Sequence, residues 1–124
     1  MTTSDTGKSE INIRRPYLDL IEQGVKTVEV RVGYASMRRI QAGQDLTFVS
    51  GDKRLPTRVT RVTEYTTFDA MLDAEDPRSI GGELGESREE LLAVIRGIYP
   101  PEKEKLGVLV IGIEVLPVSD LAAE

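Results

Sequence analysis

The sequence predicts an α+β fold, in which helices flank a small mixed sheet with a barrel-like form. Segments that alternate apolar and polar residues, as strands do, are separated by segments with helical spacing, in the order β-α-β-(α)-β-β-α-α-β. Only one helix connects two strands early in the chain, whereas a doubly wound sheet would alternate strands and helices throughout. The length of 124 residues, of which 40% are hydrophobic, suits one domain with its own core.

The first elements are a strand, a helix and a second strand. Residues 11–15 alternate, and residues 16–24 predict a helix because Pro16 suits a first turn and Gly24 suits a C-terminal end. Residues 26–32 again alternate with period two. This period gives the second strand an apolar and a polar face: Lys26, Val28, Val30 and Val32 on one, and Thr27, Glu29 and Arg31 on the other.

The middle of the chain predicts two further strands. Residues 33–44 are ambiguous between a loop and a turn of helix that ends at Gly43. Residues 45–51 predict a buried strand, and residues 55–68 alternate over a longer stretch.

The second half predicts helices followed by a closing strand. Thr67 suits the N-cap of a short amphipathic helix within residues 67–76, and the glycine-rich residues 77–85 predict a loop. Residues 86–101 predict a helix that begins with a Ser-x-x-Glu capping box at Ser87 and Glu90. Its apolar stripe consists of Leu91, Val94, Ile95 and Ile98. The apolar residues 107–116 predict a central strand.

The ends of the chain are polar. Residues 1–10 predict a disordered lead-in, residues 11–116 a single domain, and residues 117–124 a tail. No apolar run approaches the roughly 20 residues of a transmembrane helix, and the N-terminus lacks the apolar core of a signal peptide. We therefore expect no membrane partner and a cytoplasmic location.

The chain has no cysteine and no histidine. This excludes disulfides, thiolate chemistry, zinc sites built on these residues and an imidazole base. In an enzyme, proton transfer would fall to carboxylates, lysine or tyrosine. We expect no cofactor, since no phosphate loop, dinucleotide fingerprint or nucleophile elbow occurs, although an all-carboxylate magnesium site stays open.

Charge is distributed unevenly along the chain. The net charge is −5, but residues 8–61 hold 11 basic and 6 acidic side chains, whereas residues 62–124 hold 5 and 14. A basic half can form a local anion-binding surface even in an acidic protein, and ion pairing between the halves is an equally good explanation. The overall negative charge argues against duplex DNA as a partner, because tight binding to it needs many phosphate contacts.

Residues 21–31, IEQGVKTVEVR, resemble the signature of the ASCH family, G-x-K-x-x-E-x-R. Gly24, Lys26, Glu29 and Arg31 fill its four positions, and the resemblance extends over nearly all of residues 11–116. It implies a PUA-like β-barrel. Members of the family are thought to bind RNA or nucleotide-like ligands in a cleft beside this motif.

A small bacterial branch of the family hydrolyses the amide of N4-acetylcytidine. That branch uses a lysine at the position of Lys26, a threonine where this sequence has Glu29, and a downstream glutamate for which Glu83 is the best candidate. The resemblance therefore implies Lys26, Glu29 and Glu83 as catalytic candidates, in a hydrolase that needs no metal.

The same motif also has a physical interpretation. Lys26 shares a predicted face with valines, where a lysine needs a carboxylate partner or a functional role, unless it reaches water from the strand end. Glu29 and Arg31 are two residues apart on the other face. An arginine held by a carboxylate presents its remaining donors to a phosphate or a base edge. The alternatives are a structural ion pair or a solvated sheet face.

Five residues are candidates for ligand binding. The arginines supply positive charge and the tyrosines can stack on a base, although each is also explained as a surface or core residue. They are Arg14, Arg15, Tyr17, Arg31 and Tyr34.

The sequence is compatible with three alternative functions. The first is a module that binds RNA or a nucleoside-derived ligand, and the second is a metal-independent amidohydrolase acting on an acylated nucleoside. The third is a small protein-interaction domain with a structural motif. The sequence leaves the ligand and the oligomeric state open.

Overall fold

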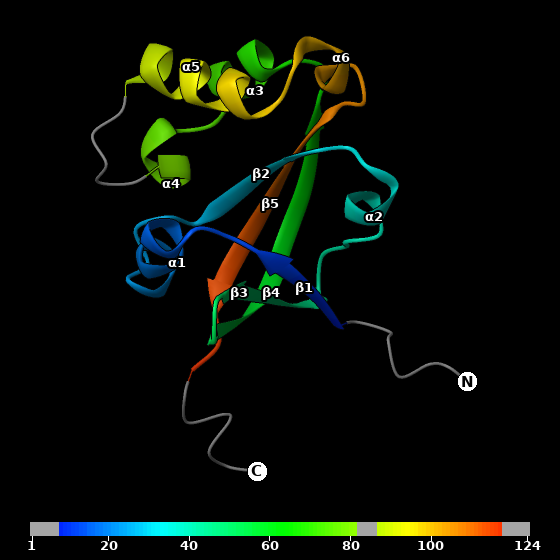
Figure 1. The fold of residues 1–124 in the computed structure, drawn as a ribbon. Helices are drawn as coiled ribbons and strands as arrows, with labels where there is room; N and C mark the ends of the chain where they lie inside the picture. The colour runs from blue at the N-terminus through cyan, green and yellow to red at the C-terminus, as the bar shows by residue number, and fades with distance from the viewer. Residues whose placement is uncertain (1–7, 82–86, 118–124) are drawn as a thin grey trace.

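The computed structural model describes residues 8–81 and 87–117. Its five strands form one curled sheet, a half-barrel, with helices packed around it (Figure 1). The strands are β1 (Lys8–Asn12), β2 (Val28–Val32), β3 (Asp45–Ser50), β4 (Lys53–Tyr65) and β5 (Val108–Val115). The helices are α1 (Arg15–Glu22), α2 (Ala35–Arg38), α3 (Phe68–Ala74), α4 (Pro77–Gly81), α5 (Arg88–Ile98) and α6 (Pro101–Glu104). None of the helices in these two ranges is long and apolar enough to cross a membrane.

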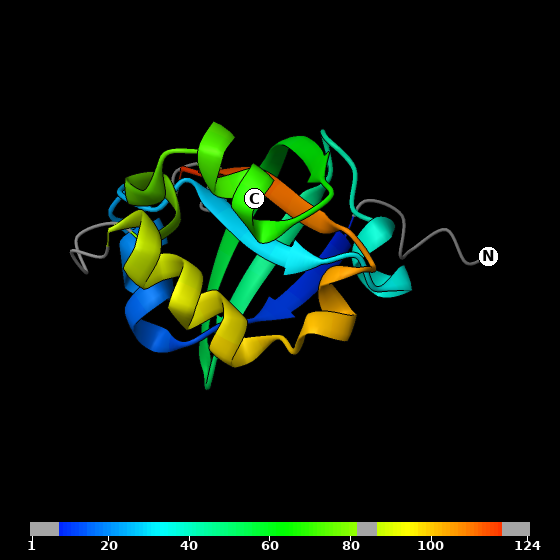
Figure 2. The ribbon, with the colours of Figure 1, turned by 90° about the horizontal axis from the view of Figure 1, so that it is seen from above.

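The sheet has the strand order β1-β3-β4-β5-β2. β1 pairs with β3 in parallel, and the other neighbours are antiparallel. β5 lies between β4 and β2, which confirms the prediction of a central closing strand. Among the described residues, the hydrogen bond that joins the edge strands β1 and β2 comes from a side chain, since Arg31 Nη2 donates to the carbonyl of Asn12 at 2.8 Å. The half-barrel therefore has an open seam between its two edges, with α1 and α5 beside it (Figure 2).

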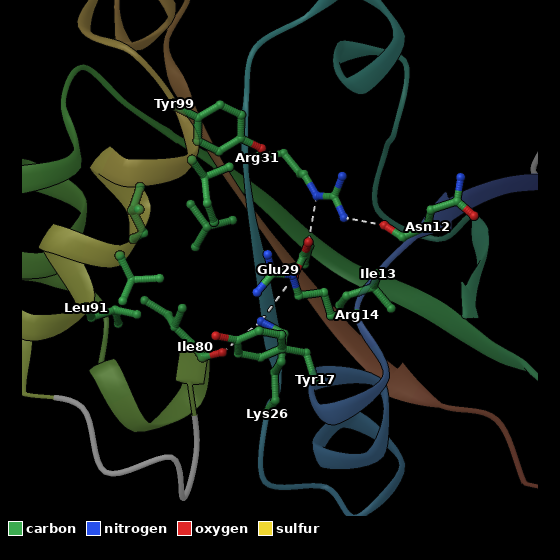
Figure 3. A pocket seen from close by; sticks show the side chains of 14 residues that line it. Asn12, Ile13, Arg14, Tyr17, Lys26, Glu29, Arg31, Ile80, Leu91 and Tyr99 are labelled. Atoms are coloured by element: carbon green, nitrogen blue, oxygen red, sulfur yellow. Dashed lines mark hydrogen bonds and ion pairs between the residues drawn. The ribbon is translucent and has the colours of Figure 1, made fainter. Parts of the chain in front are cut away.

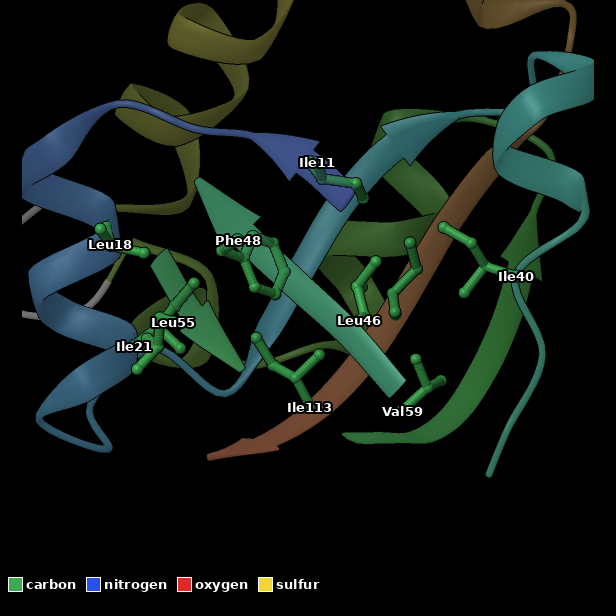
Figure 4. Packing of buried hydrophobic residues seen from close by; sticks show 10 residues of the cluster. Ile11, Leu18, Ile21, Ile40, Leu46, Phe48, Leu55, Val59 and Ile113 are labelled. Carbon is green, nitrogen blue, oxygen red and sulfur yellow. The ribbon is translucent and has the colours of Figure 1, made fainter. Parts of the chain in front are cut away.

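Two apolar clusters occupy opposite faces of the sheet. Ile111 and Ile113 of β5 belong to the inner cluster, between β1, β3, β4 and α1 (Figure 4). Val108 and Val110 point the other way, into the outer cluster beneath α3 and α5. Because successive side chains of a strand alternate between faces, one run of apolar residues in β5 serves both clusters. The pocket described below lies where the two clusters approach the seam.

The predicted end of α1 and the predicted N-terminal caps of α3 and α5 agree with the structure. Gly24, just after α1, adopts a positive φ of 81°, a conformation that favours glycine. The Thr67 side chain accepts a hydrogen bond from the Ala70 amide at the start of α3. The capping box of Ser87 and Glu90 at the start of α5 is present in both directions. These features depend on neighbours in the sequence, which is why pattern alone predicts them.

The structure departs from the predicted elements in several places. The helix predicted over residues 86–101 ends at Ile98, and α6 follows as a separate short helix. Residues Pro77–Gly81, predicted as part of a glycine-rich loop, form the short helix α4, and the following residues 82–86 lie outside the described part of the chain. β1 begins at Lys8, within the predicted lead-in, because Ser9 and Glu10 pair in register with β3. The differences at α4 and β1 come from contacts with distant segments, to which the local pattern is insensitive.

Candidate functional site

A cavity of about 230 Å³ opens beside β2, between α5 on one side and the end of β1 with the start of α1 on the other (Figure 3). One wall of the cavity is polar. It is formed by residues at the seam of the half-barrel and by residues of the predicted motif. The second wall of the cavity is apolar. It is lined by Asn12, Ile13, Arg14, Tyr17, Lys26, Glu29, Val30, Arg31, Ile80, Leu91, Val94, Ile95, Ile98 and Tyr99.

Lys26 lies at the base of this cavity and is only 4% exposed. Its ammonium donates to the carbonyls of Val28 at 2.7 Å and Ile80 at 2.8 Å, and lies 3.1 Å from Glu29 Oε1. Each of its three N–H bonds therefore has an acceptor. The predicted strand does not extend to Lys26, because β2 begins only at Val28.

Glu29 is 7% exposed, and each of its carboxylate oxygens meets a cation. Oε1 pairs with Lys26, and Oε2 accepts a hydrogen bond from Arg31 Nε at 2.6 Å. Burial alone raises the pKa of this carboxyl, but the charges of Lys26 and Arg31 and their hydrogen bonds outweigh burial and hold it below its usual value. The alternative of a solvated sheet face is wrong for Glu29, because its side chain is buried between Lys26 and Arg31.

Arg31 connects the carboxylate to the opposite edge of the sheet. Nε donates to Glu29 and Nη2 donates to the Asn12 carbonyl, while Nη1 has no hydrogen-bond partner among the described residues. The side chain is 23% exposed and lines the cavity. The guanidinium is thus fixed on one side and available on the other, as the prediction of an arginine held by a carboxylate requires.

The apolar wall comes mainly from α5 and from the residue after it. The predicted stripe of α5 is split, because Leu91 and Ile95 are buried whereas Val94 and Ile98 are exposed at the cavity. Tyr99 stacks on Phe68 with ring centroids 6.0 Å apart, and burial raises the pKa of the Tyr99 hydroxyl. The wall is therefore apolar, and it lines the same cavity as the charged groups of β2.

The structure brings five predicted residues together in one cavity: Arg14, Tyr17, Lys26, Glu29 and Arg31. The Tyr17 ring lies 5.7 Å from the Lys26 ammonium, which gives a cation–π contact. Arg14 is exposed at the cavity, and no hydrogen bond or ion pair of its side chain is found within the described ranges.

Three predicted residues do not join them. Arg15 is exposed and pairs with Asp19 along α1, so its prediction as a ligand-binding residue is not supported by its position. Tyr34 does not line the cavity. Its ring centroid lies 5.4 Å from the ammonium of Lys103. Glu83 lies outside the described residues, and its prediction stays untested.

The sequence pattern does not mark Asn12 and Tyr99 as lining residues, and it marks Val94 and Ile98 only as part of a helix stripe. That stripe has the ordinary i, i+3, i+4, i+7 spacing of one buried helix face, so the pattern held no signal that Val94 and Ile98 would be exposed at a cavity. Nothing in the local pattern marks Asn12, because its place in the cavity depends on the meeting of β1 with β2.

Few ion pairs join the two halves of the chain among the residues that the structure describes. Within the described residues, only Arg38–Glu64 and Arg61–Glu75 join the basic half to the acidic half. The other ion pairs form inside one half. No cluster of three or more candidate metal ligands occurs in residues 8–81 and 87–117.

Glu29 also couples stability to pH. Its folded-state pKa lies below its usual value of 4.5, so the unfolded chain binds more protons in this range and stability rises with pH up to that value. We expect the free energy of unfolding to fall as the pH drops below about 4.5. Urea titrations at several pH values should show a shallower fall in Glu29→Gln. Equal slopes in the two proteins would contradict this assignment.

The chain matches one family model and resembles several solved structures. The family model of the ASCH domain matches residues 11–117. The chain resembles the crystal structure of hypothetical protein PH0355, with 30% identity and a TM-score of 0.78, over 88% of this chain and 99% of that one. It also resembles the solution structure of protein PF0455 from Pyrococcus furiosus, with 33% identity and a TM-score of 0.72, over 88% and 97%.

A third solved structure is similar in fold. It is an ASCH domain from Lactobacillus crispatus, with 16% identity and a TM-score of 0.64, over 87% of this chain and 79% of that one. The search of curated proteins gave no match. The PUA-like α+β fold expected from the sequence is confirmed, as a curled five-stranded half-barrel with helices around it.

Proposed function

Because the chain belongs to the ASCH domain family, we propose that its cavity binds one nucleoside or nucleotide, either free or as a unit of single-stranded RNA. The observation that carries this proposal is the contrast between the two walls. An apolar wall formed by α5 and Tyr99 faces an arginine whose orientation is fixed by Glu29 and Asn12. A base has an apolar face and a polar edge, and it matches such a pair of walls.

The size of the cavity supports a single unit. At about 230 Å³ it is smaller than the ~300–1,000 Å³ that is typical of sites for drug-sized ligands. A nucleoside suits this volume better than a folded RNA or a duplex, whose further contacts would have to lie outside the cavity. We therefore expect modest affinity and a weak salt dependence, which reflects few phosphate contacts.

Binding can be tested with two matched variants. Ile98 is 61% exposed and lines the cavity, whereas Leu106 is 40% exposed and does not line it. We expect Ile98→Asn to weaken binding of nucleosides and mononucleotides by about tenfold, because it places an amide where the ligand's apolar face would lie. Asparagine is neutral, so the result does not depend on the charge of the ligand.

The measurement is calorimetry together with amide shifts in heteronuclear NMR, using nucleosides, mononucleotides, short RNAs and duplex DNA. Leu106→Asn should bind as the unaltered protein does. If the two variants weaken binding equally, the ligand does not occupy this cavity. If no nucleoside-derived ligand binds, the exposed Val94 and Ile98 are better explained as part of a protein-interaction surface.

A metal-independent amidohydrolase is the second candidate. It is favoured by the position of Lys26 and Glu29, which both line the cavity with Lys26 Nζ 3.1 Å from Glu29 Oε1. Both groups are already engaged, however, since every N–H bond of Lys26 and both oxygens of Glu29 have partners. We therefore favour binding over turnover. Release of cytidine from N4-acetylcytidine that persists in EDTA would reverse this preference.

A further inference from the structure

The charges that line the cavity do not cancel. Lys26 and Arg31 share a single carboxylate, that of Glu29, and Arg14 adds a third positive charge. Among the described residues no other acidic side chain lines the cavity. The described lining of the cavity therefore has more positive than negative charge, although the protein as a whole has a net charge of −5.

Among these charged groups, the atoms without a hydrogen-bond partner in the described residues are donors, not acceptors. Both oxygens of Glu29 contact a cation, and each N–H bond of Lys26 has an acceptor. The remaining capacity lies in donors, because in the described part of the chain neither Nη1 of Arg31 nor the side chain of Arg14 has a hydrogen-bond partner. Guanidinium donors bind phosphate and carboxylate oxygens more strongly than neutral acceptors.

We propose that the ligand of this cavity is an anion, and that Arg31 and Arg14 bind its phosphate monoester at the seam between β1 and β2. This proposal rests on the proposed function, since it specifies which nucleoside derivatives are preferred. The base would lie against the apolar wall of α5, and the phosphate would lie at the arginines. Because the protein's overall charge repels anions, the preference must come from this local pair rather than from long-range attraction.

The test compares each nucleoside with its 5′-monophosphate by calorimetry. We expect the monophosphate to bind about tenfold more tightly or better, as charge-assisted hydrogen bonds to an arginine allow. The phosphate monoester can come from a free mononucleotide or from the 5′ end of an RNA. A 5′-phosphorylated trinucleotide and its 5′-hydroxyl counterpart distinguish these sources, and tightening in either pair supports an anion site.

Two neighbouring arginines provide a matched control. Arg14→Gln and Arg15→Gln change the protein's charge equally, but only Arg14 lines the cavity. We expect Arg14→Gln to remove most of the preference for the monophosphate and Arg15→Gln to preserve it. Arg14 is exposed and outside the Lys26–Glu29–Arg31 group, so this variant does not disturb the buried ion pairs.

Arg31→Lys serves as the second variant, because it keeps the charge but loses the planar fork. The ratio of nucleoside to monophosphate affinity should fall in this variant as well. If nucleoside and monophosphate bind equally well, or if Arg14→Gln and Arg15→Gln have equal effects, the anion proposal is wrong while the proposed function stands. If neither ligand binds the unaltered protein, both proposals fail.

Discussion

Lys26→Met should destabilise the protein by about 3–5 kcal/mol, the usual consequence of removing one partner from a buried ion pair. The variant keeps most of the apolar stem of Lys26 but leaves Glu29 with Arg31 alone. It also removes the donor to the carbonyls of Val28 and Ile80. The loss should appear as a lower urea midpoint with an unchanged slope.

The control for this prediction is Lys53→Met. Lys53 also pairs with two carboxylates, those of Asp19 and Glu22, but these pairs lie at the surface. Its loss should change the urea midpoint much less, since solvent screens such pairs. The double variant Lys26→Met with Glu29→Gln should lose less than the two single variants together, because the charges compensate each other. Equal effects of Lys26→Met and Lys53→Met would contradict a buried role for Lys26.

Phe68→Ala should cost about 3–5 kcal/mol and should also impair the ligand site, because Phe68 is fully buried and supports the apolar wall. Its ring stacks on Tyr99, which lines the cavity, and its backbone amide donates to Glu104 at 2.8 Å. Removing the ring leaves Tyr99 without its neighbour. Affinity for the ligand, corrected for the folded fraction, is the measurement.

Leu46→Ala provides the comparison. Leu46 is also fully buried, but it belongs to the inner cluster, beside Ile40 and Val59 (Figure 4). Its truncation should cost about 2–5 kcal/mol while affinity per folded molecule stays close to that of the unaltered protein. Where Phe68→Ala leaves too little folded protein, Phe68→Leu gives the same comparison with a smaller cavity. If affinity per folded molecule is unchanged in both Phe68 variants, the wall does not depend on this stack.

Much of the site could be predicted because the motif is short. Lys26, Glu29 and Arg31 lie within six positions of one another, and alternation correctly places Glu29 and Arg31 on one face of β2. The pattern does not show whether that face meets water. A sheet that curls turns one face inward, and curling is a property of all five strands together.

The rest of the site comes from segments that are far apart in the sequence. Lys26 bonds to Ile80, 54 positions away, and Arg31 bonds to Asn12, 19 positions away. Val94 and Ile98 line the cavity because α5 lies on the opposite side of it from the start of α1 (Figure 3). No local pattern contains this information, since each contact depends on how distant elements pack.

The sequence by itself determined the fold class, the end of α1 and the N-terminal caps of α3 and α5, the central strand and the family, because these depend on periodicity, on capping residues and on a contiguous motif. It also determined that chemistry based on histidine or cysteine is excluded. Only the tertiary structure decided that Glu29 is buried between two cations, that Arg14 faces the cavity and Arg15 does not, and that Tyr34 lies elsewhere. The physical reason is that burial and pairing of charges are set by contacts across the seam of the half-barrel, which form only when the whole sheet has folded.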